Sequence, residues 1–349
     1  MRVMTHNTPL SPRPLHDLSG RGRLRVMTVA QLRSHGVTSS ETNEQCRPGG
    51  PWQQLLPGVV LLHPGPPTSE ERLHAVLMYA ARERGTGVPA QPGASGGHAP
   101  AYPDVMITGL AALTLHGFSS TPPLPSLDAI DVLVPRLRRL RSTGCARIVR
   151  SAPLPAPEQV TGLPVAPVAR ALADAVADLR DAGTVRRLMT EAVRGAHCEP
   201  AAVVRELNEA RLLSRPHVVD AVESLLAEGR VIAEDRLYRM VREYGLPDPV
   251  WNVDLRLPGG PYLGGLDAYW PDQAVALELD TRAPRQDDDA LWSEYARKRE
   301  HLERLGITVV HITPRKLRDS PEQQATVVRT ALMASADRDP AAYVLVLPR

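Results

Sequence analysis

Three carboxylates toward the C-terminal end of the chain have the spacing of a divalent-metal site. Asp267 lies at the expected end of one strand, just before Trp270-Pro271, and Glu278 and Asp280 end the next strand two residues apart. Residues two apart in a strand project from the same face, so neighbouring antiparallel strands would bring all three carboxylates to one rim. Oxygen ligands of this kind suit Mg²⁺ or Mn²⁺, which activate water and neutralise charge on a scissile phosphate.

Two further residues could complete this site. Glu234 begins a predicted helix and could add a fourth carboxylate, and Lys298, in a helix expected over residues 291–305, could contact DNA or stabilise negative charge. Carboxylates this close repel one another unless a cation compensates, so we expect Glu278→Ala to stabilise the metal-free protein. The alternative is that these acids lie in solvated turns at strand ends and bind nothing.

A second candidate region is a run of six arginines within fifteen residues that hold no acid, at positions Arg136, Arg138, Arg139, Arg141, Arg147 and Arg150. Guanidinium groups bind nucleic-acid phosphates, and we expect the first four of these arginines to contact DNA, with Arg138 and Arg139 on an exposed surface. The alternative is a solvated strand–turn–strand edge with no partner.

The composition of the chain excludes several classes of protein. The chain has 349 residues with 41 basic and 39 acidic side chains, a formal net charge of +2, so no global positive field marks a nucleic-acid binder. Apolar runs fall short of the ~18 residues that a membrane helix needs, and Cys46, Cys145 and Cys198 form no C-x-x-C pair. The first 24 residues have no apolar signal region. We therefore expect a cytoplasmic protein with no membrane partner, no disulfide framework and no structural zinc.

The N-terminal part of the sequence has the outline of a small DNA-binding domain. Residues 1–25 are expected to be disordered. Over residues 26–84, a helix capped by Thr28, a second helix with a capping box from Thr38 to Glu41, and two strands about Pro57-Gly58 follow the order of a winged helix-turn-helix. A Gly/Pro-rich linker is expected over residues 85–103.

The remainder of the chain predicts mixed α/β structure. Residues 104–215 should form a middle domain, with helices over 105–115, 165–179 and 185–193 and a buried strand over 129–134. Residues 216–335 should form a third domain. Two helices are expected there, separated near Gly229. Strands are expected over residues 250–257, 262–269, 274–280 and 307–313, and the helix that carries Lys298 lies between the third and the fourth strand in the sequence. Residues 336–349 are expected to be a tail.

Several ordered blocks over residues 230–335 resemble the very-short-patch-repair-like branch of the PD-(D/E)xK nucleases. These blocks are Glu234-Asp-Arg-Leu237, Gly264-Gly-Leu-Asp267, Trp270-Pro271, Ala276-Leu-Glu-Leu-Asp280 and Leu305-Gly-Ile-Thr-Val-Val-His-Ile-Thr-Pro314. The resemblance implies a restriction-endonuclease-like fold and metal-dependent hydrolysis of DNA.

That resemblance also implies roles for particular residues. It places metal-binding and catalytic roles on Asp267 and Glu278, and makes Glu234 the acid carried by a helix. Asp280 stands where a conventional core has lysine, as is common in this branch. The branch usually has a His shortly after the E-x-D strand, and residues 281–285 contain none.

The N-terminal half resembles the antitoxins of abortive-infection type IV toxin–antitoxin systems (AbiEi-like). The blocks that carry this resemblance are residues 27–32, 52–60, 107–117, 130–135 and 162–172. The resemblance implies a winged helix that binds promoter DNA and a middle domain that neutralises a nucleotidyltransferase toxin. The candidate recognition segment, residues 39–46, departs from this expectation because it carries Glu41 and Glu44 and no basic residue.

Two functions remain open from the sequence. The first is a DNA-acting defence or regulatory protein whose third domain is a Mg²⁺- or Mn²⁺-dependent endonuclease with Glu234, Asp267, Glu278 and Asp280 as its catalytic residues. The second is a non-catalytic antitoxin-like transcriptional regulator whose nuclease fold is degenerate. Retention of the carboxylates favours the first function, and the missing loop His favours the second.

Overall fold

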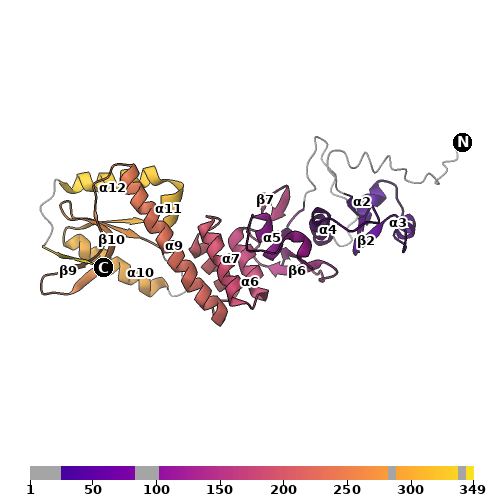
Figure 1. The fold of residues 1–349 in the computed structure, drawn as a ribbon, viewed down its shortest axis with the longest axis horizontal. Coiled ribbons are helices and arrows are strands. Elements are labelled where there is room, and N and C mark those ends of the chain that lie inside the picture. Colours follow the sequence, from indigo (N-terminus) through magenta and orange to yellow (C-terminus); the bar gives the residue numbers. More distant parts are fainter. Residues whose placement is uncertain (1–24, 83–101, 282–287, 337–342) are drawn as a thin grey trace. The chain divides into compact units, whose positions relative to one another are not determined.

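The chain folds into two compact units, residues 1–178 and 179–349, of mixed α/β structure. The computed structural model describes residues 25–82, 102–281, 288–336 and 343–349 (Figure 1). The described residues form three sheets, which confirms the predicted mixed α/β class. The expected disordered N-terminus and Gly/Pro-rich linker fall almost entirely outside the described residues.

The N-terminal part of the first unit follows the predicted helix–helix–hairpin order. Its elements are β1 (Val26–Thr28), α2 (Val29–Ser34), α3 (Ser39–Gln45), β2 (Gln53–Leu56), β3 (Val59–Leu61) and α4 (Ser69–Ala81), and the strands form an antiparallel sheet in the order β1-β3-β2. Thr28 and Thr38 cap α2 and α3, as the sequence predicts, and the predicted capping box of Thr38 with Glu41 is present. Thr28 forms a second capping box, with Gln31. Leu32, Val37, Trp52 and Val60 form a small core beneath them.

The rest of the first unit is a five-stranded mixed sheet in the order β6-β5-β4-β8-β7. Its elements are β4 (Met106–Thr108), α5 (Gly109–Leu115), the short helix η1 (Leu124–Ser126), β5 (Ile130–Pro135), β6 (Ala146–Ser151), β7 (Glu158–Val160), β8 (Leu163–Val165) and α6 (Val168–Asp178). The prediction of a helix beginning at Val105 is wrong at its start. Met106–Thr108 instead form the central strand, completely covered by neighbours on both sides, and a helix begins only at Gly109.

The second unit begins with three helices, α7 (Ala182–Arg194), α8 (Pro200–Glu209) and α9 (Pro216–Glu243). The sequence predicts two helices separated near Gly229, but α9 is one continuous helix of 28 residues. Gly229 is buried there, and a Cβ at this position would collide with the ring of Pro200 on α8. The glycine therefore permits a close helix–helix approach instead of ending a helix.

A five-stranded sheet in the order β12-β11-β10-β9-β13 forms the centre of the second unit. The elements are β9 (Val250–Arg256), β10 (Tyr262–Trp270), β11 (Val275–Leu279), α10 (Asp288–Arg304), β12 (Thr308–Ile312), α11 (Pro314–Asp319), α12 (Pro321–Ala336) and β13 (Leu345–Pro348). β11 and β12 are parallel, and the other pairs are antiparallel. β13 lies in the segment expected to be a tail and extends the sheet at β9.

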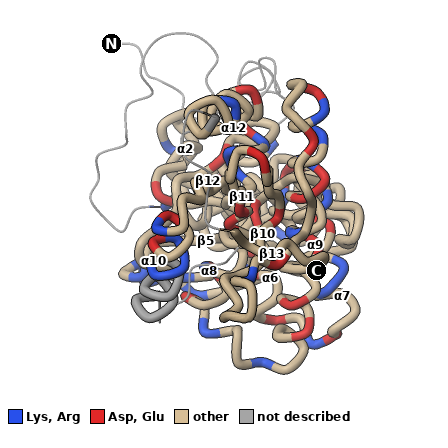
Figure 2. The backbone as a smooth tube through the Cα atoms, turned by 90° about the vertical axis from the view of Figure 1, so that its left-hand side faces the viewer, with Lys and Arg blue, Asp and Glu red and all other residues tan. Residues whose placement is uncertain are grey.

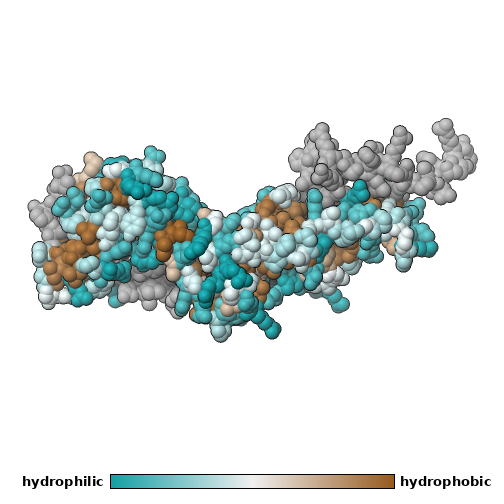
Figure 3. Space-filling model, in the orientation of Figure 1, coloured by the Kyte–Doolittle hydropathy of each residue, from teal (hydrophilic) through white to brown (hydrophobic). Residues whose placement is uncertain are grey.

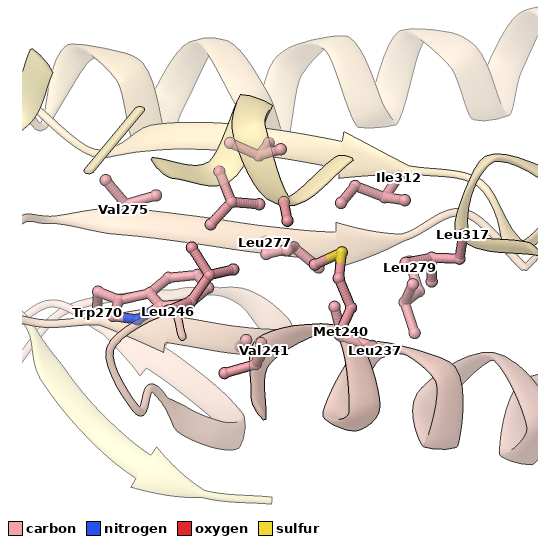
Figure 4. Close-up of a cluster of buried hydrophobic side chains, with 14 of the residues drawn as sticks. Leu237, Met240, Val241, Leu246, Trp270, Val275, Leu277, Leu279, Ile312 and Leu317 are labelled. Atoms are coloured by element: carbon pink, nitrogen blue, oxygen red, sulfur yellow. The ribbon is translucent and has the colours of Figure 1, made fainter. Parts of the chain in front are cut away.

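Helices cover both faces of this sheet (Figure 1). One core cluster joins α9, α11 and α12 to Trp270, Val275 and Leu277. Figure 4 shows Met240 of α9 pointing toward Leu277 of β11 within this cluster. A second cluster on the opposite face packs Leu302 of α10 against Tyr269 and Ala276. Residues that alternate along β10 and β11 therefore face helices on opposite sides.

Because Leu277 is completely buried between β11 and α9, its truncation tests this packing. We expect Leu277→Ala to lower the free energy of unfolding by roughly 2–5 kcal/mol, through lost burial and the cavity left behind. Leu347→Ala on the exposed strand β13, where the leucine is 41% exposed, is the control and should cost far less. Chemical denaturation followed by circular dichroism measures both, and equal losses would contradict the core described above.

Candidate functional site

Two of the predicted site carboxylates lie side by side on adjacent interior strands of the sheet in the second unit. Asp267 is on β10 and Glu278 on β11, and each residue is only 8% exposed. The antiparallel register pairs Ala268 with Leu277, so Asp267, one residue before Ala268, lies beside Glu278, one residue after Leu277. The two acids are therefore neighbours, as predicted, but Asp267 lies within β10 and not at its end. Antiparallel pairing brings the end of one strand beside the start of the other, so only a residue inside β10 can lie beside Glu278 near the end of β11.

Asp267 is held by two donors. Its Oδ1 accepts a hydrogen bond from Arg230 Nη2 at 2.9 Å, and its Oδ2 accepts one from the backbone N–H of Leu279 at 2.6 Å. Burial raises the pKa of this carboxyl above its usual range; the Leu279 N–H and the Arg230 charge oppose the rise, while Glu234 and Glu278 add to it. The side chain is thus fixed in orientation and sensitive to both neighbouring acids.

Glu234 joins this group through an arginine that sequence reasoning missed. Arg230 and Glu234 lie one turn apart on α9, and Arg230 Nε donates to Glu234 Oε1 at 2.8 Å. The same guanidinium reaches Asp267, so it bridges the helix-borne acid to the strand-borne acid. The i,i+4 spacing of Arg230 before Glu234 was the available signal, but only packing of α9 on the sheet shows the second partner.

Glu278 is paired with a lysine from the opposite helix layer. Lys298 of α10 forms an ion pair with Glu278 Oε1, and its Nζ also donates to the carbonyl of Gly265 at 2.9 Å. A Cβ on Gly264 would collide with Cε of Lys298, and Gly264 has a φ of +136° that few other residues adopt. Gly264 therefore leaves the space through which Lys298 reaches the carboxylate.

A histidine completes the surroundings of Glu278. In the parallel pairing of β11 with β12, His311 lies directly opposite Glu278, and its Nδ1 is 3.4 Å from Glu278 Oε2. The sequence alone suggests a core-edge histidine for His311, since it sits in a Val/Ile strand. The strand register, which the sequence does not give, brings it to the carboxylates instead.

Asp280 does not join the cluster. It follows the last residue of β11, its side chain is exposed, and its backbone N–H donates to the carbonyl of Ile312 at 3.0 Å. Its carboxylate forms no hydrogen bond or ion pair with any residue that the structure describes. Over the described ranges, no three His, Cys, Asp or Glu side chains are arranged to hold a metal ion. The three-carboxylate ligand set is thus not assembled there.

The expectation that these carboxylates repel one another without a metal needs correction. Arg230 lies between Glu234 and Asp267, and Lys298 contacts Glu278, so the chain supplies its own compensating cations. Removing Glu278 would leave Lys298, which is only 20% exposed at its side chain, without its carboxylate partner. The expected stabilisation by Glu278→Ala is therefore replaced by an expected loss.

The donor chemistry of the pair fits a hard divalent cation. Mg²⁺ is commonly held by one or two carboxylates, with water and phosphate oxygens filling its other positions. Each carboxylate oxygen can accept more than one partner, so the bonds to Arg230, Leu279 and Lys298 leave acceptor capacity on both Asp267 and Glu278. Those two residues are the ligands that the geometry offers.

The arginine-rich segment of the first unit, residues 136–150, separates into two groups. The side chains of three arginines are bonded to other groups of the fold, although Arg150 is itself exposed. Arg147 pairs with Asp131 and Asp178, Arg138 donates to the carbonyl of Ala80 at 3.0 Å, and Arg150 donates to the carbonyl of Arg138 at 3.2 Å. The expectation of an exposed Arg138 is thus wrong, because this residue is half-buried and fixes the backbone of α4.

The other three arginines are exposed at the surface, at positions Arg136, Arg139 and Arg141. Their side chains have no hydrogen-bond or ion-pair partner among the described residues. Figure 2 shows basic and acidic residues interspersed over the described chain, in agreement with its small net charge. A local group of cations without acids is therefore the distinctive feature of this segment.

The acidic residues of the candidate recognition helix α3 are partly neutralised. Glu41 Oε2 accepts from the backbone N–H of Thr38 at 2.7 Å as part of the capping box, and Glu44 pairs with Arg47 at 2.7 Å. The two acids thus have roles at the ends of the helix. They carry less uncompensated charge toward a phosphate than the sequence suggests.

Comparison of the sequence with protein-family models and with curated proteins finds no match. None of the helices in the described part of the chain combines the length and apolar character that crossing a membrane requires.

The ion pair between Glu278 and Lys298 can be tested by a double-mutant cycle. We expect Glu278→Ala to lower the free energy of unfolding by roughly 3 kcal/mol, because it leaves a largely buried ammonium group unpaired. The double variant Glu278→Ala/Lys298→Met should lose less than the sum of the two single variants. Denaturant titration in EDTA measures all four proteins. A Glu278→Ala protein more stable than wild type would show that repulsion among the acids dominates.

The raised pKa of Asp267 predicts a specific pH dependence. The Asp267 carboxyl binds its proton more tightly in the folded state than in the unfolded chain. The protonated carboxyl therefore contributes its full stabilisation of the fold below the usual pKa of 3.8, and this stabilisation is lost as the pH rises through the folded-state pKa. The melting temperature of Asp267→Asn minus that of wild type should therefore become more positive between pH 3.8 and neutrality. Asp235→Asn, at an exposed position on the same helix as Glu234, should show no such trend.

Proposed function

We propose that the second unit is a metal-dependent endonuclease of the PD-(D/E)xK type, within a DNA-acting defence or regulatory protein. One observation carries this proposal. Two buried carboxylates, Asp267 and Glu278, lie on neighbouring strands, and a lysine contacts Glu278. Two acids on adjacent strands with a lysine beside them are the groups that a PD-(D/E)xK core uses. Here the lysine comes from α10, while the usual strand position holds Asp280.

Each residue would have a definable task in this proposal. Asp267 and Glu278 would hold Mg²⁺ or Mn²⁺, which when bound neutralises charge on the scissile phosphate and lowers the pKa of bound water. Arg230 keeps Asp267 in a fixed orientation through its 2.9 Å bond. Lys298, anchored on the carbonyl of Gly265, would donate to a phosphate oxygen and stabilise developing negative charge.

Glu234 and Asp280 have weaker support for a catalytic role. Glu234 lies beside the site, but its contact is with Arg230, so it acts on Asp267 through that guanidinium. Asp280 is exposed and would have to turn toward the site to become a ligand. In this proposal either residue would be an additional ligand, since a bound cation would attract a further carboxylate.

A second candidate function has its own supporting observation. Because Arg230 and Lys298 already compensate the acids, the cluster is stable without a metal, as a structural scaffold requires. The helix–helix–hairpin order of the first unit fits an antitoxin-like regulator that binds DNA and a nucleotidyltransferase toxin. In that case the second unit would be a non-catalytic nuclease fold.

Incubation of the full chain with supercoiled plasmid DNA and Mg²⁺ or Mn²⁺ tests the first proposal. We expect nicking or linearisation that EDTA abolishes, and that Asp267→Asn, Glu278→Gln and Lys298→Met each reduce by about 100-fold or more, the typical loss on removing a charge-stabilising group. Asp235→Asn, on the solvent side of α9, should cleave as wild type does.

Metal binding separates the two candidate functions. Saturating Mn²⁺ should raise the melting temperature of the wild type, because the cation binds the folded state alone, and Glu278→Gln should lose this response. Absence of binding at millimolar Mn²⁺ by calorimetry would remove the basis of the nuclease proposal. Binding without cleavage would favour the non-catalytic regulator.

A further inference from the structure

The turn that follows β5 presents one apolar side chain among exposed arginines. We name residues 136–141 the arginine–leucine loop. Leu137 is 91% exposed, the most exposed of the large hydrophobic side chains that the structure describes. Arg136, Arg139 and Arg141 are exposed around it. Figure 3 shows that hydrophobic residues on the visible face occur as separate patches in a hydrophilic surface. The loop thus presents one exposed leucine together with three exposed cations.

The arginine–leucine loop is held firmly from behind. Arg138 donates to the carbonyls of Ala80 and Arg82 at the end of α4, and the Tyr79 hydroxyl donates to the carbonyl of Arg141 at 2.7 Å. Arg150 donates to the carbonyls of Arg138 and Leu140, and Leu140 itself is buried. These bonds fix the loop backbone, so the exposed side chains are presented without a large ordering cost on binding.

We propose that the arginine–leucine loop binds duplex DNA, with Leu137 inserted between base pairs from the minor groove and the three exposed arginines on the flanking phosphates. Proteins that bind the minor groove use this combination of cations with an apolar wedge that partly unstacks one base step. The proposal rests on the DNA-acting character of the proposed function, but not on the carboxylates, and its test is made without metal.

The chemistry of the loop favours DNA over other anionic partners. A lipid surface requires more buried apolar area than one leucine provides, since each inserted methylene contributes only about 0.8 kcal/mol. A stable protein interface buries about 800 Å² on each partner and is centred on a cluster of apolar or aromatic residues, whereas here one leucine stands among cations. A base step accepts a single side chain of this size.

Binding of the full-length protein to a fluorescent duplex, measured by anisotropy in EDTA at several salt concentrations, tests the role of the arginines. We expect Arg136→Ala/Arg139→Ala/Arg141→Ala to weaken binding at least tenfold at low salt. The log–log salt slope should become shallower by about 2–3, since each neutralised phosphate contributes about 0.9. The matched control Arg186→Ala/Arg205→Ala/Arg242→Ala removes the same charge from exposed positions in the second unit and should leave the slope unchanged.

A duplex with a central 2-aminopurine tests the role of Leu137, since the emission of this base rises when its stacking is disturbed. Wild type should raise the emission, and Leu137→Ala should remove most of that rise and weaken binding about threefold to tenfold with the salt slope unchanged. Met333→Ala, at a leucine-sized side chain 69% exposed on α12, is the control.

Three results would overturn the proposal. The first is a salt slope that changes equally in the two triple variants, which would show that only total charge matters. The second is a Leu137→Ala protein that binds and raises the emission as wild type does. The third is tighter binding to phosphatidylserine-containing vesicles than to the duplex at equal ionic strength. Because all measurements are made in EDTA, an inactive carboxylate site would leave the expected results unchanged.

Discussion

Compensation of buried carboxylates by cations from two different helices is the interaction on which the candidate site depends. Asp267 and Glu278 lie on neighbouring strands with little exposure to water, which would be costly for two unpaired negative charges. Arg230 reaches the first from α9, and Lys298 reaches the second from α10. Since these helices cover opposite faces of the sheet, the site joins both layers of the second unit.

Small residues make these approaches possible. Gly264 leaves space for the lysine stem beside β10, and Gly229 allows α8 to pack closely on the helix that carries Arg230 and Glu234. In both places a side chain would collide with its neighbour. Each glycine therefore makes room for a group from another element: a lysine of α10 at Gly264 and a proline of α8 at Gly229. This role cannot be recognised from the sequence alone, where Gly229 resembles the end of a helix.

The first unit uses arginine in two ways within one short segment. Arg138, Arg147 and Arg150 satisfy backbone carbonyls or buried acids and hold the segment in place. The backbone of the segment is fixed by these bonds, and Arg136, Arg139 and Arg141 are exposed on it. Arginine suits both tasks because its planar group of donors can bind carbonyls, carboxylates or phosphates without losing its charge.

The sequence by itself determined the mixed α/β class, the capped helices α2 and α3, and the placement of Asp267 and Glu278 on neighbouring strands, because these follow from local periodicity and capping chemistry. Only the tertiary structure decided which groups meet them. Strand register placed His311 beside Glu278, helix packing brought Arg230 to Asp267, and the end of β11 left Asp280 in solvent. Similarly, the arginines of residues 136–150 look alike in the sequence. Which of them bond to the described part of the fold and which remain free to bind a partner depends on the carbonyls and acids within reach of each side chain. Such contacts join residues far apart in the chain, so no local pattern encodes them.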